Sequence, residues 1–333
     1  MTRAGTRDST GAAASAGLVA SATGRSAFTP RHVELSLPPG HRFPMTKYDR
    51  LADRLERDGW SLQRSPAASW RQLALAHSLP YLRAVRACRL DSAAERRLGF
   101  PQSPALVRRS LASTGGTVAA LAQALRCGLG VHLAGGTHHA FAGSGEGFCL
   151  FNDLVVAARA LRARARRVLV IDLDVHQGNG TAALAADDRE LVTYSVHGAR
   201  NYPFRKVPSD LDRALPDGVD DDGYLALIAH DVPWLLRRYA PDAVLYQAGV
   251  DVLDGDRYGR MGLSPQGVQA RDALVARACF AAGVPLAYAL GGGYHPDLGV
   301  TVEAHRRGLE AIAAAWREGW TVAAALTDAP GVC

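Results

Sequence analysis

One stretch of the chain, RRVLVIDLDVHQGNG at residues 166–180, constrains the fold more than any other. It contains four consecutive apolar residues at 168–171, and a run of this kind predicts a strand that is buried on both faces. Beyond the run, polar and apolar residues alternate through Asp172, Asp174 and His176 until glycines break the pattern. Strands covered on both faces belong to parallel sheets, so the stretch favours an α/β fold.

The three polar residues of this stretch indicate a metal site. A β-strand places alternate residues on one side, about 7 Å apart for each two-residue step. Asp172, Asp174 and His176 therefore share one side at the end of the strand. Two carboxylates and an imidazole this close repel or desolvate one another unless a cation lies between them. The alternative, an N-capping aspartate with a histidine in a turn, accounts for only one of the three.

The rest of the chain alternates predicted strands with predicted helices. Further strands are expected at 131–133, 191–196, 243–246 and 285–290, and helices at 153–164, 224–239 (interrupted near Pro233), 265–282 and 300–316. This alternation produces right-handed βαβ units around a parallel sheet. We therefore expect a single-domain α/β protein with three layers, α/β/α, and a mainly parallel central sheet. Residues 28–60 are rich in proline and are not expected to supply a central strand.

Composition limits the domain boundaries and the partners. Residues 1–27 lack the apolar segment of a secretion signal and are expected to be a disordered leader. The folded domain is expected at 28–320, with a tail at 321–333. No apolar run approaches the roughly 18–20 residues of a membrane span, so no membrane contact is expected. The net charge of +6 comes from scattered arginines without a nucleic-acid module, so no specific nucleic acid is expected.

The five cysteines of the chain indicate its redox environment. No two cysteines are spaced as CxxC, which argues against a disulfide framework or a cysteine zinc site and for a reducing, cytoplasmic location. The sequence leaves the oligomeric state open.

Candidate site residues follow four predicted strands at their carboxyl ends, where open parallel α/β sheets bind ligands. They are His138 and His139, Asp172 with Asp174 and His176, Asp251, and Tyr294. Asp174, His176 and Asp251 form a set that leaves positions open for water and substrate. A catalytic zinc requires such an arrangement, although Fe(II), Mn or Co would also accept it.

These residues suit metal-assisted hydrolysis of an amide. A metal polarises the carbonyl and lowers the pKa of bound water, and a nearby imidazole takes the proton. His138 and His139 supply the imidazole, and Tyr294 follows a triple-glycine loop from which it can donate to the developing oxyanion. Each feature also has a simpler explanation. His138 and His139 could be a surface pair, the glycines before Tyr294 could form only a strand–helix turn, and Asp251 could cap a helix.

With these pieces together, the chain resembles the histone deacetylase superfamily, which has the arginase-like α/β fold. The resemblance covers about residues 28–317 and rests on six motifs in the family's order: GGTHHA (135–140), GEGFCLFND (145–153), VLVIDLDVHQGNG (168–180), TYSVHG (193–198), YQAGVDVLDGDRYG (246–259) and LGGGY (290–294). The DLDVHQGNG form and the HRFPMTKY segment near residue 41 are most similar to the class IV branch and its bacterial relatives.

The resemblance implies a role for each matching position. Asp174, His176 and Asp251 would bind zinc, with Fe²⁺ as the other candidate metal. His139 would be the general base and acid, His138 its electrostatic neighbour, and Tyr294 would polarise the scissile carbonyl. The resemblance further implies Asp172 as the partner of His138. It also implies a structural K⁺ site at Asp172, Asp174, His176, Ser195 and Val196, and a substrate tunnel at Gly147, Phe148, Tyr202 and Tyr258.

Two positions depart from familiar branches of the superfamily. Asn179 stands where class I members have an aspartate partner for the histidine matching His139, and a neutral amide raises the pKa of an imidazole less than a carboxylate does. Tyr258 stands where acetylpolyamine-specific members often have an acidic residue. The DAHxD-type motif of the ureohydrolases is absent from the sequence.

The expected function is zinc-dependent hydrolysis of N-ε-acyl-lysine amides, as in deacetylases of the histone deacetylase type. The alternative enzyme hypothesis is a deacylase of small acylated amines, such as an acetylpolyamine or a natural-product intermediate. A catalytically inactive binding scaffold would require loss of a ligand or of the tyrosine, and both are present.

Overall fold

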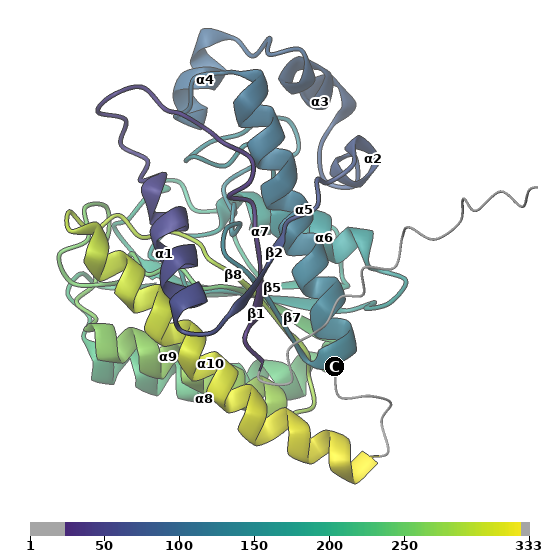
Figure 1. The fold of residues 1–333 in the computed structure, drawn as a ribbon, viewed down its shortest axis with the longest axis vertical. Helices are drawn as coiled ribbons and strands as arrows, with labels where there is room; N and C mark the ends of the chain where they lie inside the picture. The colour runs from purple at the N-terminus through teal and green to yellow at the C-terminus, as the bar shows by residue number, and fades with distance from the viewer. Residues whose placement is uncertain (1–23, 328–333) are drawn as a thin grey trace, which may run out of the picture.

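A parallel eight-stranded sheet forms the centre of the molecule (Figure 1). The computed structural model describes residues 24–327. The strands lie in the order β2-β1-β3-β8-β7-β4-β5-β6, and every neighbouring pair is parallel. The predicted α/β fold with a mainly parallel sheet is therefore confirmed. The strands are β1 (Ser26–Thr29), β2 (Ser61–Arg64), β3 (Leu129–His132), β4 (Val168–Asp172), β5 (Leu191–Gly198), β6 (Leu211–Leu215), β7 (Ala243–Gln247) and β8 (Leu286–Ala289).

Helices cover both faces of this sheet. One layer contains α1, α8, α9 and α10, and the other contains α5, α6 and α7, with the short helices α2, α3 and α4 beyond α5 (Figure 1). The bounds are α1 (Thr46–Arg57), α2 (Trp70–Leu73), α3 (Leu79–Arg86), α4 (Ser92–Leu98), α5 (Pro104–Cys127), α6 (Asp153–Ala160), α7 (Asn179–Ala185), α8 (Asp221–Tyr239), α9 (Pro265–Ala281) and α10 (Leu298–Thr327).

Strand β4 contributes to a hydrophobic core on each side of the sheet. Leu169 and Ile171 belong to the cluster that packs against α8, α9 and α10. Val168 and Val170 belong to the cluster that packs against α5 and α6. All four side chains are buried, because successive residues of a strand point to opposite faces. The prediction that residues 168–171 form a strand buried on both faces is thus confirmed.

Three strands differ from the sequence prediction. β1 lies inside the sheet between β2 and β3. The expectation that the proline-rich segment 28–60 supplies no central strand is therefore wrong for residues 28 and 29, which belong to β1. β1 ends before Pro30, which therefore removes no hydrogen bond from the ladder. The sequence does not predict β2 or β6. Both are edge strands whose residues are half-buried or exposed, so they lack a strong apolar pattern.

The domain boundaries also shift. The predicted leader, 1–27, overlaps β1, because Ser26 and Ala27 are buried in the sheet. Helix α10 continues to Thr327 and therefore includes the beginning of the predicted tail at 321–333. Residues 1–23 and 328–333, on which the rest of both predictions falls, lie outside the described part of the chain.

Helix α8 runs through Pro233 without the predicted interruption. Proline removes the hydrogen bond to the carbonyl four residues earlier. That carbonyl belongs to Ala229, which is exposed, so water can satisfy it. The surrounding residues Ile228, Val232 and Leu235 are buried in the core, and their packing holds the helix together.

The structure also bears on the expected absence of a membrane span and of disulfides. Within residues 24–327, no helix is long and apolar enough to cross a membrane. Cys88, Cys149 and Cys279 are free, whereas Cys127 takes part in a disulfide that the cysteine spacing did not predict.

Candidate active site

The strand order explains why residues far apart in sequence meet. β3, β8, β7 and β4 are consecutive neighbours in the sheet, and all four are parallel. The segments that follow their carboxyl ends are therefore adjacent. They carry the predicted residues His138 and His139, Tyr294, Asp251, and Asp174 with His176. The structure brings all of these residues together at one edge of the sheet.

Asp174, His176 and Asp251 form a compact group of potential metal ligands. One ligand atom from each lies within 4.8 Å of the other two. The Nδ1 atom of His176 is 2.9 Å from Oδ1 of Asp174 and 3.2 Å from Oδ2 of Asp251. All three residues are buried or nearly so. Burial raises the pKa of the Asp251 carboxyl, and the nearby carboxylate of Asp174 raises it further. A cation between these groups would relieve that repulsion.

Backbone and amide donors fix the orientation of the two carboxylates. Oδ2 of Asp174 accepts hydrogen bonds from the side chain of Gln247 at 2.8 Å and from the backbone N–H of Gly292 at 3.0 Å. Oδ1 of Asp251 accepts from the N–H of Val175 at 2.9 Å. Each carboxylate thus uses one oxygen for support and directs the other toward His176. Loss of such support typically costs about 10- to 100-fold in metal affinity or activity.

His138 and His139 have different partners. Their rings are 4.0 Å apart, and both side chains are buried. Nδ1 of His138 is 2.6 Å from Oδ2 of Asp172, so Asp172 supports this histidine and is not part of the ligand group. Burial opposes protonation of His138, but the carboxylates of Asp172 and Asp174 outweigh it and raise the pKa of His138 to about 9.

His139 is instead held by an amide. Its Nδ1 atom is 2.7 Å from Oδ1 of Asn179, while Nδ2 of Asn179 donates to Glu146 at 2.8 Å. A carboxylate can only accept, so the Asn179 amide must turn its oxygen toward His139. Nδ1 of His139 therefore carries the proton and Nε2 is an acceptor. Burial lowers the pKa of His139 well below its usual value, and the positive charges on His138 and His176 lower it further.

Tyr294 is positioned by the triple-glycine loop. Gly291 and Gly293 adopt positive φ angles of 72° and 138°, which favour glycine. A Cβ atom on Gly292 would approach Oδ2 of Asp251 to 2.0 Å, so only glycine fits beside this carboxylate. The backbone N–H of Tyr294 donates to Asp256 at 2.7 Å. Burial raises the pKa of the Tyr294 phenol well above its usual value, so the hydroxyl is protonated and can donate.

A buried lysine lies against this loop. Lys47 of α1 is 1% exposed and donates to the carbonyl of Gly291 at 3.0 Å. Its ammonium lies 5.4 Å from the ring centre of Tyr294 and 5.3 Å from that of Tyr48. Burial lowers the pKa of Lys47 to about 8, and Asp251, Asp174 and Asp256 oppose the shift. Lys47 thus places a cation behind the tyrosine.

The site opens into a cavity of about 790 Å³. His139, Asp174, His176 and Tyr294 line its inner part. The four residues predicted for a substrate tunnel also line it: Gly147, Phe148, Tyr202 and Tyr258. The ring of Tyr202 meets that of His139 edge-on at 5.0 Å between centres, and Phe148 lies 6.2 Å from Tyr294. Aromatic walls therefore flank the approach to the histidine and the tyrosine.

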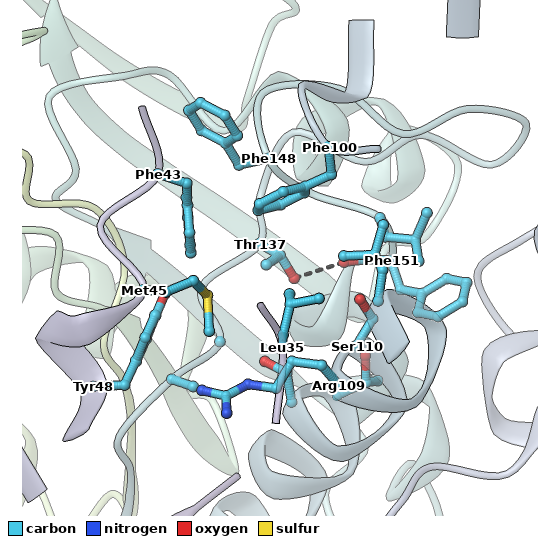
Figure 2. Close-up of a pocket in the computed structure, with 16 residues that line it drawn as sticks. Leu35, Phe43, Met45, Tyr48, Phe100, Arg109, Ser110, Thr137, Phe148 and Phe151 are labelled. Atoms are coloured by element: carbon cyan, nitrogen blue, oxygen red, sulfur yellow. Dashed lines mark hydrogen bonds between the residues drawn. The ribbon is translucent and has the colours of Figure 1, made fainter. Parts of the chain in front are cut away.

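A second, smaller cavity of about 60 Å³ adjoins the first. Figure 2 shows it enclosed by aromatic and aliphatic side chains, with Phe43 and Phe148 on one side and Leu35 and Arg109 on the other. The hydroxyl of Thr137 donates to the carbonyl of Phe151 at 2.6 Å in its wall. Phe43, Thr137 and Phe148 line both cavities, so the small one lies directly beside the large one.

Comparison with known proteins identifies the family. A family model described as a histone deacetylase domain matches residues 41–309. The chain belongs to the histone deacetylase family. An uncharacterized protein of Picosynechococcus sp. is 43% identical over 277 residues, covering 81% of this chain and 92% of that protein. Histone deacetylase 2 of Arabidopsis thaliana is 32% identical over 272 residues, covering 76% of this chain and 70% of its own length.

Solved structures give the same fold. The crystal structure of an HDAC homolog complexed with SAHA superimposes with a TM-score of 0.72 at 24% identity, covering 87% of this chain and 83% of the other. As a member of the histone deacetylase family, the protein is a hydrolase that acts on amide bonds. The fold suggests a catalytic metal, and Asp174, His176 and Asp251 are a candidate site for it.

Three supporting residues of this histone deacetylase family member are not predicted from the sequence. Glu146 accepts hydrogen bonds from Asn179 and from the hydroxyl of Tyr202, both at 2.8 Å. Gln247 orients Asp174, and Lys47 contacts Tyr294. Glu146 and Gln247 lie inside the GEGFC and YQAGVD motifs, so a polar residue within a conspicuous motif was the available signal. For Lys47 the signal was a lysine in a chain that has only one other.

The residues predicted for potassium also lie together. Asp172 of β4 is the register partner of Ser195 of β5, and Val196 is the next residue along β5. All three are buried. The Ser195 hydroxyl lies 3.0 Å from Nδ1 of His197.

Proposed function

We propose that the protein is a zinc-dependent deacylase that hydrolyses the amide of N-ε-acyl-lysine. The observation that carries the proposal is the combination of one ligand group and one free imidazole nitrogen at the inner end of one cavity. Asp174, His176 and Asp251 supply the ligands. Nε2 of His139 and the Tyr294 phenol complete the site on the cavity wall.

The donor set fits zinc. Two carboxylate oxygens and one imidazole nitrogen are ligands that Zn²⁺ accepts, and three protein ligands leave room for water and substrate. Fe²⁺ accepts the same donors. The buried carboxylates also favour a divalent cation, because without one Asp251 resists ionisation beside Asp174. When bound, the metal would polarise the substrate carbonyl and make water a stronger acid.

The protein's own residues account for the proton transfers. Nε2 of His139 accepts a proton from the attacking water, because Asn179 holds the ring proton on Nδ1. His139 then returns that proton to the departing amine. The phenol of Tyr294 donates a hydrogen bond to the carbonyl oxygen as negative charge develops on it. The imidazolium of His138, held by Asp172, adds positive charge beside the reacting atoms.

The cavity fits an extended acyl-lysine side chain. We assign Phe148 and Tyr202 to the walls of a tunnel around its methylene groups, with Gly147 at the wall and Tyr258 toward the mouth. A side chain on Gly147 would come within 2.6 Å of the His139 ring, so glycine at this position preserves the width of the tunnel. Tyr258 carries no charge that would attract a second ammonium group, which favours acyl-lysine over an acetylpolyamine.

We also propose a structural potassium ion beneath the site. Asp172 and Ser195 are paired across neighbouring strands, and Val196 follows, so their oxygens can contribute to one shell with the main-chain oxygens of Asp174 and His176. Hard oxygen donors of this kind suit a large monovalent cation. The ion would hold the end of β4, from which the metal ligands extend.

Activity and metal content of purified variants test the proposal. The zinc-loaded enzyme is expected to hydrolyse acyl-lysine peptides, and a series from acetyl to myristoyl defines the acyl length. His139→Ala and Tyr294→Phe are expected to lose turnover by at least about 100-fold while they keep bound metal and fold. His230→Ala, on the exposed face of α8, is the matched control. Near-normal rates in both site variants would refute the assignment.

A further inference from the structure

The mouth of the large cavity has an unusual charge composition. Five arginines line it: Arg42, Arg97, Arg200, Arg257 and Arg260, which we call the arginine rim. Among the described residues that line the cavity, the only carboxylate is that of Asp174, a buried member of the candidate ligand group. The whole chain has 38 basic and 32 acidic residues, so its average composition does not account for this imbalance. The electrostatic potential at the mouth is therefore expected to be positive.

Most of this charge is available to a ligand. All five arginines are exposed. Arg200 and Arg260 share one carboxylate, Asp217, at 2.7 and 3.4 Å. Arg42, Arg97 and Arg257 form no ion pair with any residue in the part of the chain that the structure describes. Guanidinium groups bind carboxylates through two parallel hydrogen bonds, so these three offer docking points for anionic groups.

The rim is also tied to the catalytic residues. The backbone carbonyl of Arg97 accepts from the N–H of Gly147, the tunnel-wall glycine, at 3.1 Å. Asp256 accepts from the N–H of Tyr258 at 2.9 Å and from that of Tyr294 at 2.7 Å, so one carboxylate joins the segment of Arg257 to the catalytic tyrosine. The backbone at Arg97 and the segment of Arg257 are therefore held at a fixed place relative to the tunnel.

One exposed aromatic side chain completes the mouth. Phe204 is 89% exposed and lines the same cavity. Its ring meets that of Tyr202 edge-on at 6.4 Å. A large apolar side chain held in water beside arginines offers a contact to an apolar part of a ligand that also carries negative charge. A substrate with only positive charges, such as a polyamine, would be repelled.

We propose that the preferred substrate is an acyl-lysine flanked by acidic residues, and that the arginine rim selects it. The inference rests on the proposed deacylase function of the same site. Glutamate or aspartate side chains next to the acyl-lysine pair with the exposed guanidiniums while the acyl-lysine occupies the tunnel. A free carboxylate on a small acylated amine has the same chemistry, so the test separates the two sources.

Matched substrates measure this selection. Three acetyl-lysine peptides differ only in the residues flanking the lysine, which are acidic, neutral or basic. Free N-ε-acetyl-lysine and an acetylpolyamine complete the set. The kcat/KM is expected to fall from the acidic to the neutral to the basic peptide, by about 1.4- to 5-fold for each arginine engaged. The ratio of acidic to neutral peptide is expected to approach one at about 1 M salt, where charges are screened within about 3 Å.

Charge reversal tests the residues themselves. Arg42→Glu and Arg257→Glu are expected to lower the ratio of kcat/KM for the acidic over the neutral peptide, and together to reverse it. Arg277→Glu, on the exposed face of α9, makes the same change of charge away from the mouth and is expected to leave the ratio unchanged. Because each ratio is taken within one variant, a partly unfolded sample does not alter it.

The outcomes distinguish this inference from the function on which it rests. If the neutral and basic peptides are hydrolysed as well as the acidic one at low salt, the substrate preference is wrong and the deacylase function stands. If free acetyl-lysine exceeds the acidic peptide, the rim recognises a small anionic molecule and the peptide assignment fails. If no acylated amine is hydrolysed by the metal-loaded enzyme, the proposed function itself fails, and the inference with it.

Discussion

Replacement of Asn179 by aspartate tests how the protein controls His139. The Asn179 amide donates to Glu146 at 2.8 Å, so the substitution places a second carboxyl at that distance. Two full charges 2.8 Å apart repel by about 6 kcal/mol at an effective dielectric constant of about 20. Keeping a proton at pH 7 on a carboxyl with an ordinary pKa near 4 costs only about 4 kcal/mol. The new pair is therefore expected to retain one proton at neutral pH.

The retained proton gives this variant a distinct behaviour. A protonated carboxyl can donate to Glu146 and accept from His139, as the amide does. Asn179→Asp is therefore expected to keep kcat/KM within about 3-fold of the wild type, whereas Asn179→Leu is expected to lose about 10- to 100-fold, as supporting residues commonly do. Adding Glu146→Gln to Asn179→Asp removes the repulsion and lets the new carboxyl ionise beside His139.

The pH dependence of kcat/KM separates these states. An ionised carboxyl raises the pKa of a neighbouring imidazole, so the acidic limb of the profile is expected to move to higher pH in the double variant. The single variant Asn179→Asp is expected to keep the limb of the wild type. Metal content, measured in parallel, must be equal in all the variants. If the single variant shifts the limb as far as the double variant does, the reasoning about the shared proton is refuted.

Three further predictions follow from other contacts. Asp251→Asn should weaken metal binding by at least about 100-fold, which metal analysis after dialysis measures, because even supporting residues cost 10- to 100-fold. Lys47→Met should lower kcat by about 5- to 30-fold with little change in KM, because without the cation behind its ring the Tyr294 phenol donates a weaker hydrogen bond to the charge that develops on the carbonyl oxygen, an effect of about 1–2 kcal/mol; an equal change in KM would contradict this. Arg271→Met should destabilise the protein by about 3–5 kcal/mol in urea unfolding, because it leaves Asp272 buried and unpaired. Asp272→Asn in the same background should recover part of the loss.

The sequence predicts the central sheet well and its margins poorly. Strands β4 and β7 appear as apolar runs because helices cover both of their faces. Edge strands β2 and β6 are half solvated, so no apolar pattern marks them. β1 (SAFT) begins with Ser26 and ends with Thr29, so no apolar run marks it, and it is recognisable only through its pairing with β2 and β3.

The same distinction applies to the site. The predicted ligands and the histidine pair follow strands, and parallel topology alone brings them together. Glu146 acts through Asn179, 33 residues away, and Lys47 contacts a loop 244 residues away. Such pairs depend on how loops and an N-terminal helix pack over the sheet, which no local pattern records. The arginine rim is likewise assembled from distant segments, and single arginines are common in this chain.

The position of β8 has a consequence for how the enzyme is made. β8 is the last strand in the chain, yet it lies in the middle of the sheet, between β3 and β7. Until residues 286–289 are synthesised, the strands that precede the histidine pair and those that precede the proposed metal ligands belong to two separate half-sheets. We therefore expect a nascent or truncated chain lacking β8 to be without hydrolytic activity, since insertion of this strand joins the two halves of the catalytic centre. The enzyme would therefore gain activity only after β8 and the glycine loop that carries Tyr294 have been added to the chain.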